Sequence, residues 1–323
     1  MEMARPVSRR LLHLFLLGFL VCALSMVGSE AASAAKAPKE APKETSQRLI
    51  PDHESRNALQ YWTEERFRSA VPKDVERQAP RQIIKQPGKG EPKPQASAVP
   101  VGAYDSYPYS TIGKVFFTDP VSKTDYVCSG TSLSSRNGSI VDTAGHCVIE
   151  GGSGNNFYVN WVFCPQYLDG YCPRGVWPAR QLHTTGQWAN NADFSRDIGF
   201  AVVATNNGMT LNQAVGGVRL ATDLPAEQNF RALGYPQEPP FTGQRMYQCT
   251  SPATVRDTNG SPQPIGINCD MTGGSSGGGW LIRGRGSWYL NGHTSYVYTN
   301  LPDVLFSPYY DGFVGYIFNQ IQG

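Results

Sequence analysis

The sequence predicts an all-β domain, folded as a barrel or a sandwich, over residues 101–323. This region is rich in Gly, Ser, Thr, Asn, Val and Tyr. Its short apolar runs are separated by turn pairs such as Asn137-Gly138 and Asn291-Gly292. Many short strands at this spacing are typical of barrels and sandwiches. The predicted strands are 112–117, 126–133, 139–142, 156–163, 198–203, 217–220, 229–234, 244–250, 280–282 and 293–299.

The C-terminal end is the part of this domain that the sequence predicts to be helical. Its apolar side chains recur at the spacing of one helix face. We expect this face to dock on the β domain. The residues are Phe313, Val314, Ile317, Phe318 and Ile321.

Residues 1–35 have the features of a secretory signal peptide. Three arginines lie between positions 5 and 10, an uncharged apolar run spans 11–27, and small residues at 32–35 fit a cleavage site. A membrane anchor is the alternative, but the run is short for a membrane span. We therefore predict a secreted, extracellular protein that does not contact the membrane once the signal is removed.

Residues 36–100 are predicted to be a prosegment and linker. The stretches 36–43 and 80–100 are rich in Pro, Lys, Glu or Gln and cannot bury a core, so they should be disordered. Between them, 54–71 suits one short amphipathic helix, which Pro72 would end. A helix between disordered flanks favours a prosegment that keeps an enzyme inactive until export, and a plain tether is the alternative. The apolar residues of the helix are Leu59, Tyr61, Trp62, Phe67 and Val71.

Seven cysteines occur, and Cys22 lies in the predicted signal peptide. The other six are an even number in an extracellular chain, which indicates three disulfides. Metal binding is the alternative, but no C-x-x-C or H-x-x-x-H spacing supports it. We therefore expect neither a metal nor another cofactor. The six are Cys128, Cys147, Cys164, Cys172, Cys249 and Cys269.

The distribution of charge argues against a nucleic-acid partner. The whole chain has a net charge of +2, whereas residues 101–323 hold 12 Lys/Arg and 15 Asp/Glu, a net charge of −3. No basic patch with interleaved aromatic residues occurs in this region, and such a patch is the usual footprint of nucleic-acid binding.

A glycine-rich stretch from Met271 to Trp280 reads Met-Thr-Gly-Gly-Ser-Ser-Gly-Gly-Gly-Trp. Glycines allow unusual backbone angles and leave N–H groups free to face a developing oxyanion. A serine in such a turn becomes a nucleophile when a base takes its proton. By itself, the stretch fits a mobile loop between two strands equally well.

A candidate base and its orienting carboxylate precede this loop. His146 lies in Thr-Ala-Gly-His-Cys after a predicted strand, and the adjacent Cys147 can pair with Cys128 to brace it. Asp197 opens the apolar strand Asp-Ile-Gly-Phe-Ala-Val-Val. A carboxylate leading into a buried strand needs a specific partner, so Asp197 is the expected orienter of the imidazole. Asp193 is the competitor, but its polar neighbours indicate a loop residue.

The motifs Thr-Ala-Gly-His-Cys, Asp-Ile-Gly-Phe and Gly-Gly-Ser-Ser-Gly-Gly, in this order, resemble those of the trypsin/chymotrypsin-like serine proteases. Within this family the chain is most similar to the secreted bacterial branch that includes the glutamyl endopeptidases. The resemblance covers residues 101–323 and implies a double six-stranded β-barrel with the site between the barrels. It implies that His146 is the base, Asp197 its orienter and Ser276 the nucleophile. The N–H groups of Gly274 and Ser276 would then form the oxyanion hole.

The resemblance also supports a Cys128–Cys147 disulfide. Proximity along the chain adds Cys164–Cys172 and Cys249–Cys269, although spacing alone does not determine connectivity. We therefore expect a monomeric, secreted serine endopeptidase, made with a prosegment, whose partners are protein or peptide substrates.

Two other classes of function are possible. Gly274 to Gly278 also satisfies G-x-S-x-G, the nucleophile turn of α/β-hydrolase esterases. That fold needs its acid and then its histidine after the serine, whereas His293 precedes Asp303 and no β–α alternation is visible. A protease-like binding module is the second alternative, but such modules usually lack a triad residue and all three are present here.

Three positions depart from the family pattern, and one of them, Gly279, stands where the family usually has proline. Ser275 stands where the trypsin pattern has an aspartate that pairs with the new N-terminus after activation. Removal of a blocking prosegment is therefore the expected route of activation. Gly145 replaces the commoner alanine, and we expect this difference to be harmless.

Residues 291–296, Asn-Gly-His-Thr-Ser-Tyr, resemble the strand that lines the primary specificity pocket of the family. On that match the backbones of Ser295 and Tyr296 pair with the substrate, and Thr294 forms the pocket wall. Glutamyl-specific relatives carry histidine at the wall position. His293 is one place earlier, so it should face the opposite way.

Asp270 lies six residues before Ser276, where trypsin-like members place the carboxylate that binds Arg or Lys. An aspartate at this offset also occurs in glutamyl-specific relatives, and a charge capping a loop is the structural alternative. The sequence therefore leaves the choice among acidic, basic and apolar specificity open.

Overall fold

The computed structural model describes residues 44–73, 76–78 and 95–323. The predicted signal peptide, the predicted linker stretch 36–43 and residues 80–94 of the predicted linker stretch 80–100 lie outside the described residues. Those that are described belong to one compact unit, Pro42–Gly323. No helix among them is both long and apolar enough to cross a bilayer.

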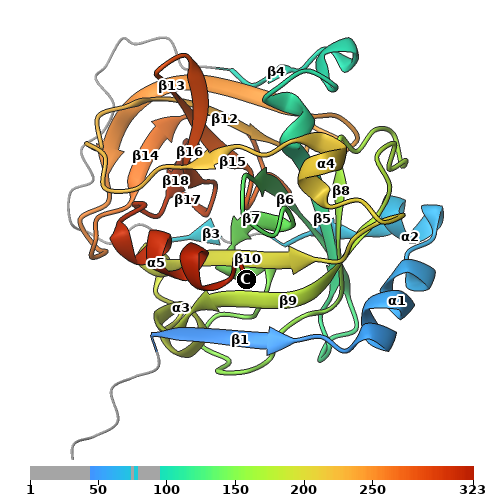
Figure 1. Cartoon of the computed structure of the whole chain (residues 1–323). Helices are drawn as coiled ribbons and strands as arrows, with labels where there is room; N and C mark the ends of the chain where they lie inside the picture. The colour runs from blue at the N-terminus through green and yellow to red at the C-terminus, as the bar shows by residue number, and fades with distance from the viewer. Residues whose placement is uncertain (1–43, 74–75, 79–94) are drawn as a thin grey trace, which may run out of the picture. The chain divides into compact units, whose positions relative to one another are not determined.

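Six strands in the first half of this unit close into a barrel (Figure 1). Their order is β9-β10-β7-β6-β5-β8, and β8 pairs back onto β9. Val115 and Phe117 point into the barrel core, whereas the intervening Phe116 packs outside it, which is the period-two alternation of a strand. The strands are β5 (Ile112–Thr118), β6 (Asp125–Leu133), β7 (Ile140–Ala144), β8 (Val159–Pro165), β9 (Trp177–Thr185) and β10 (Ile198–Val203).

The second half forms a sheet in the order β11-β16-β15-β12-β13-β14-β18-β17-β3, with β4 paired to β13. Strands β16 and β17 are successive pieces of one segment separated by Thr294 and Ser295, so the sheet returns to its own start. The predicted double β-barrel is confirmed. The strands are β4 (Ser97–Ala98), β11 (Arg219–Leu220), β12 (Asn229–Gly234), β13 (Tyr247–Arg256), β14 (Ile265–Asn268), β15 (Gly279–Gly284), β16 (Ser287–His293), β17 (Tyr296–Tyr298) and β18 (Leu301–Ser307).

Strands β9, β14, β16 and β18 were not predicted. The predicted strand 293–299 overlaps β16 only at its last residue, His293. Each of the four strands contains residues that are depleted in strands, such as Pro178 in β9 and Pro302 in β18. Pairing with distant strands stabilises them: β18 joins β14 to β17, and β9 closes the first barrel. Tertiary pairing therefore overrides local preference at these four places.

The described part of the predicted prosegment is folded onto the domain. Strand β1 (Thr45–Leu49) pairs antiparallel with β9, followed by α1 (Asp52–Tyr61), α2 (Glu64–Ser69) and β2 (Val71–Pro72). The expectation of one helix over 54–71 is wrong, because the side chain of Thr63 accepts from the Arg66 N–H and starts a second helix.

The packing of this segment also differs from the expected amphipathic face. Leu59 and Val71 are exposed. The buried anchors are Trp62 and Phe67, whose rings stack with centroids 5.4 Å apart and both contact Phe116 of β5. Residues 44–73, which lie between the two stretches expected to be disordered, are held on the domain because these aromatic rings bury apolar area against the first barrel.

The predicted C-terminal helix is present as α5 (Gly312–Gln320). Asp311 caps it by accepting from the Phe313 N–H, and Val314, Ile317 and Phe318 are buried against the domain. This packing confirms the docking face. The remaining helices are short: α3 (Gly186–Asn191), α4 (Leu211–Val215), and the 3₁₀ turns η1 (Val101–Ala103), η2 (Tyr109–Thr111), η3 (Gly145–Cys147) and η4 (Phe194–Arg196).

Three disulfides are formed, and all three match the expected pairs. They are Cys128–Cys147, Cys164–Cys172 and Cys249–Cys269. The first joins β6 to η3, and the third joins β13 to the segment that leads into the glycine-rich loop.

A lysine is buried between the first barrel and the loops beside it. Lys114 of β5 is fully buried, and its ammonium donates to Gln237 Oε1 at 2.6 Å and to the Gly243 carbonyl at 3.0 Å. Neither acceptor carries a charge. Burial therefore lowers the pKa of Lys114 to about 7.

This lysine should make stability depend on pH. In the unfolded chain Lys114 keeps its proton up to about pH 10.4, whereas in the folded protein it loses the proton near pH 7. Between these pH values the unfolded state binds more protons than the folded state. The contribution of Lys114 to the free energy of unfolding therefore rises with pH, at up to about 1.4 kcal/mol per pH unit, and this contribution is lost as pH falls through 7. Lys114→Met should remove this rise. Urea unfolding of the wild type and of Lys114→Met at pH 7 and pH 9 measures the free energy of unfolding. The same difference between the two pH values in both proteins would contradict the prediction.

Candidate active site

His146 and Asp197 lie at the adjacent ends of two paired strands of the first barrel. In the antiparallel pair of β7 and β10, Ala144 is opposite Ile198. The segment after Ala144, which contains His146, therefore lies next to Asp197, which precedes Ile198. Asp197 Oδ1 accepts from the His146 backbone N–H at 2.8 Å, and Oδ2 lies 2.8 Å from His146 Nδ1. The carboxylate therefore holds both the backbone and the ring of His146.

The Asp197 carboxylate is fully buried. Burial acts to raise its pKa, but the interactions with His146, the hydrogen bond from Ser295 and the charge of His293 outweigh burial and lower the pKa. Ser295 donates to Oδ2 at 2.5 Å. The carboxylate is therefore ionised at neutral pH and fixes the proton of His146 on Nδ1, which leaves Nε2 as an acceptor.

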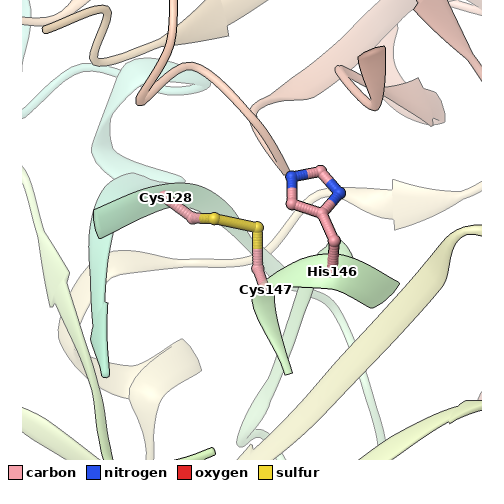
Figure 2. A group of neighbouring side chains, drawn as sticks. All are labelled: Cys128, His146 and Cys147. Carbon is pink, nitrogen blue, oxygen red and sulfur yellow. A yellow bond between two sulfur atoms is a disulfide. The ribbon is translucent and has the colours of Figure 1, made fainter. Parts of the chain in front are cut away.

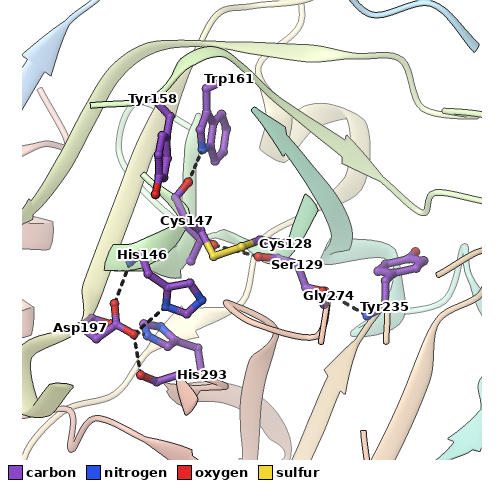
Figure 3. Close-up of a disulfide and its surroundings, with 12 residues drawn as sticks. Cys128, Ser129, His146, Cys147, Tyr158, Trp161, Asp197, Tyr235, Gly274 and His293 are labelled. Carbon is purple, nitrogen blue, oxygen red and sulfur yellow. Dashed lines mark hydrogen bonds and ion pairs between the residues drawn. A yellow bond between two sulfur atoms is a disulfide. The ribbon is translucent and has the colours of Figure 1, made fainter. Parts of the chain in front are cut away.

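A second buried histidine supports Asp197 from behind (Figure 3). His293 Nε2 donates to the Asp197 carbonyl at 2.9 Å. Its Nδ1 lies 3.2 Å from Asp142 Oδ2 and 2.6 Å from the Tyr310 hydroxyl, which also donates to Asp142 Oδ1 at 2.7 Å. His293 thus points away from the pocket, as expected one residue before Thr294, and connects the second barrel to Asp197.

The Cys128–Cys147 disulfide lies directly beside His146 (Figure 2). The two sulfurs and a ring nitrogen lie within 4.8 Å of one another, a grouping that resembles a metal site. A disulfide offers no thiolate, however, so these residues do not fit a metal ion. The Trp161 indole donates to the Cys147 carbonyl at 2.9 Å, and the corner that carries His146 is held on both sides.

The glycine-rich loop adopts the tight turn that its sequence predicts. Gly274 has φ +89° and Gly277 has φ +78°, a region that favours glycine. A Cβ on Gly277 would lie 2.1 Å from Thr143 Oγ1, and one on Gly278 would lie 2.1 Å from the Leu233 carbonyl. Glycine is required because the loop lies directly against the backbone of both barrels.

Ser276 lies within this turn, next to strand β6. Its carbonyl accepts from the Ser129 N–H at 2.7 Å, and the Gly274 carbonyl accepts from the Ser129 hydroxyl at 2.8 Å. The neighbouring Ser275 hydroxyl is occupied, since it donates to the Thr272 carbonyl at 2.7 Å. The N–H groups of Gly274 and Ser276 have no acceptor among the described residues.

The structure joins two members of the predicted triad by a hydrogen bond and leaves the third unbonded. His146 Nε2 is buried and has no hydrogen-bond partner in the part of the chain that is described. Gly277, which follows Ser276, packs closely on Thr143 and Ala144, which lie shortly before His146. Catalytic hydrogen bonds often tighten only when substrate binds.

A cavity of about 200 Å³ opens beside Ser276. The predicted substrate-binding residues Thr294, Ser295 and Tyr296 line it, as do Met271 and Leu305. Thr294 Oγ1 accepts from the Trp280 indole at 3.0 Å, which fixes its orientation.

Asp270, the fourth predicted substrate-binding residue, is not among the residues that line this cavity. Its carboxylate accepts from the Ala96 N–H at 2.6 Å. Asp270 therefore serves as an anchor for the segment that precedes the first barrel, which is the structural alternative considered for it.

Two solved structures share both fold and sequence with this chain. The protease Anisep from Arthrobacter nicotinovorans is 37% identical, with a TM-score of 0.62, and the alignment covers 66% of this chain and 95% of Anisep. The thermostable serine protease AL20 from an extremophilic microorganism is 41% identical, with a TM-score of 0.62 and coverage of 69% and 99%. This chain belongs to the trypsin/chymotrypsin-like serine proteases. It is accordingly a hydrolase of peptide bonds.

A structure of a Glu endopeptidase in complex with MPD has a TM-score of 0.55 and is 18% identical. The alignment covers 70% of this protease and 97% of the Glu endopeptidase, and at this identity it supports the fold alone. No protein-family model matches the protease, and no curated protein matches it either.

Sequence reasoning missed the support behind this protease's site. Asp142 and Tyr310 are 168 residues apart, and nothing in either local sequence indicates that they meet. One available signal was an aspartate within an otherwise apolar strand, because a buried carboxylate needs a partner. The contact of Gly145 with Trp188 was also missed, since the sequence showed only that glycine replaces the commoner alanine there. A Cβ there would lie 2.7 Å from Trp188 Cδ1 and 2.8 Å from Asp197 Oδ1.

Gly145→Ala should therefore damage the site. Both contacts are buried and fixed, so we expect the free energy of unfolding to fall by about 1–3 kcal/mol and peptide hydrolysis to fall on the order of tenfold as His146 and Asp197 separate. Gly102→Ala is the matched control, because a Cβ at Gly102 meets nothing within 4 Å. Thermal unfolding and peptide hydrolysis measure both effects, and a Gly145→Ala protein equal to the control would disprove the steric argument.

Proposed function

We propose that this protease is a secreted endopeptidase that uses His146, Asp197 and Ser276 as a catalytic triad. The observation that carries this proposal is the buried, doubly bonded His146–Asp197 pair, whose free Nε2 lies at the corner packed against the Ser276 turn. A fully buried carboxylate held in this way has the geometry needed to orient a general base.

The reaction would begin with attack of Ser276 Oγ on the carbonyl carbon of the substrate. His146 Nε2 takes the hydroxyl proton, and Asp197 stabilises the resulting imidazolium. The carbonyl electron pair moves onto its oxygen, where the unbonded N–H groups of Gly274 and Ser276 can donate to it. Loss of one such donor typically lowers the turnover rate by a factor of about 10²–10³.

The tetrahedral intermediate then collapses to an acyl-enzyme. The C–N bond breaks, and the leaving amine takes the proton from His146 Nε2. Water attacks the ester with His146 again acting as the base, and the acid product leaves as Oγ regains its proton. Every proton passes through the one nitrogen that Asp197 leaves free.

Ser276→Ala should lower peptide hydrolysis by about 10³-fold or more without unfolding the domain, because the attacking oxygen is lost. Ser275→Ala is the matched control, since the Ser275 hydroxyl donates within the loop and is not free to attack. A serine-directed phosphonate should label Ser276. Full activity of the Ser276→Ala protein, or labelling of Ser275 alone, would refute the assignment.

The cavity beside Ser276 suits an uncharged side chain. Its buried lining includes Met271, Thr294 and Leu305, whereas Glu76 and Glu238 are exposed. No Lys, Arg or His lines it among the described residues, so an acidic side chain would find no counter-charge. Asp270 is not among its lining residues, so its carboxylate does not face a basic side chain bound there.

We therefore expect cleavage after apolar or aromatic residues. In peptides that differ only at the residue before the scissile bond, Leu, Met or Phe should be cleaved at least about tenfold faster than Glu or Arg, since burying an unpaired charge is costly. Product analysis by mass spectrometry gives the ratio. Preference for Glu would show that a cation reaches the cavity, and preference for Arg would restore a role for Asp270.

Export and activation belong to the same proposal. The apolar N-terminus supports a signal peptide, and three disulfides suit an extracellular protein. Because Ser275 replaces the expected aspartate, we propose that removal of the segment before residue 101 activates the enzyme. The intact mass of the exported protein tests this, and a mature form that begins at Met1 would exclude it.

A further inference from the structure

A short piece of the N-terminal segment lies against the cleft that contains Ser276. Strand β3 (Glu76–Arg77) pairs in parallel with β17, and the Arg77 carbonyl accepts from the Thr299 N–H at 3.0 Å (Figure 1). Glu76 lines the same cavity as Ser276. A few residues earlier, the Lys73 N–H donates to the Val127 carbonyl of β6 at 3.1 Å, so the segment contacts strands of both barrels.

The Arg77 side chain enters an aromatic enclosure. Its guanidinium carbon lies 4.2 Å from the ring centre of Phe194, 4.8 Å from that of Tyr296 and 5.4 Å from that of Tyr298. Rings within about 6 Å attract a cation through their negative faces. Phe194 belongs to the turn directly before Asp197, and Tyr296 follows Ser295, so the enclosure adjoins the catalytic residues.

A buried carboxylate completes this enclosure. Asp257 is 1% exposed and accepts from the hydroxyls of Tyr296 and Tyr298, both at 2.5 Å. Burial acts to raise the pKa of Asp257, but these hydrogen bonds and those from Asn259 outweigh it and lower the pKa. Asp257 is therefore a buried anion.

Such an anion needs a cation to offset its desolvation. Within the described ranges, the cation that pairs with it is Arg77, at 3.7 Å. Since Arg77 belongs to the proposed prosegment, the charge of Asp257 is left unpaired when that segment is removed.

We propose that Phe194, Tyr296, Tyr298 and Asp257 form a substrate subsite for an arginine or lysine side chain, and that Arg77 occupies it in the unprocessed chain. This rests on the proposed function of the Ser276 site. Tyr296 and Tyr298 border both this subsite and the cavity that takes the residue before the scissile bond, whereas Phe194 and Asp257 do not line that cavity. In the full chain, Arg77 acts as an internal competitor of substrate.

Binding to full-length protein that cannot cleave itself tests this proposal. The proteins are Ser276→Ala and the double variant Arg77→Ala/Ser276→Ala. The probes are fluorescent peptides with arginine at the second, third or fourth residue before the scissile bond, each paired with a peptide that carries neutral citrulline instead. In the double variant, one arginine peptide should bind on the order of tenfold tighter than its citrulline partner. The same peptide should bind the single variant on the order of tenfold more weakly, because Arg77 fills the subsite.

The matched control is Arg68→Ala/Ser276→Ala, which removes an exposed arginine of the same segment that pairs with Glu64 in α2. It should bind like the Ser276→Ala protein. Asp257→Asn should erase the preference for arginine over citrulline. If this variant fails to fold, the citrulline comparison with Asp257 intact still decides the matter. Equal binding of the paired peptides, no gain on Arg77→Ala, or no binding at all would overturn the proposal.

Hydrolysis separates this proposal from the proposed function. With Ser276 intact, an Arg77→Ala chain that binds arginine peptides but does not cleave them would leave the subsite standing and refute the endopeptidase assignment. Cleavage that does not distinguish arginine from citrulline would refute the subsite and leave the endopeptidase assignment standing.

Discussion

The burial of the Asp197 carboxylate is the constraint on which the site depends. An ionised group without solvent is tolerated only when its oxygens are fully bonded. Here the bonds come from the His146 backbone and ring and from the Ser295 hydroxyl, while His293 holds the carbonyl of the same residue. Because His146 lies in the first barrel and Ser295 in the second, satisfying this one charge also fixes how the two barrels meet.

Close backbone approach is the second requirement, and it explains where glycine occurs. The Ser276 turn packs Gly277 and Gly278 against the strands of both barrels, at distances that exclude a side chain. Gly145 performs the same role on the histidine side, where Trp188 and Asp197 fill the space that a Cβ would need. Because glycine has no side chain at these positions, three backbone segments can pack closely at the corner that holds the proposed triad.

The N-terminal segment combines two physical roles. Trp62 and Phe67 stack against Phe116 and extend the core of the first barrel, while β1 adds a strand to its edge. Farther along, Arg77 places a cation in an enclosure of rings that ends at a buried carboxylate. The anchoring contacts raise the effective concentration of Arg77 at the cleft, so even a weak side-chain interaction can compete with substrate.

The sequence by itself determined the double-barrel family and predicted the base, the orienter and the nucleophile, because each is carried by a short motif whose chemistry is local. Thr-Ala-Gly-His-Cys and Gly-Gly-Ser-Ser-Gly specify a corner and a turn through their own backbone preferences. Only the tertiary structure decided that His293 supports Asp197, that Asp270 binds Ala96 outside the cavity, and that Arg77 meets Asp257. These contacts join residues 96 to 180 positions apart, and strand register and burial across both barrels, which no local pattern encodes, bring them together.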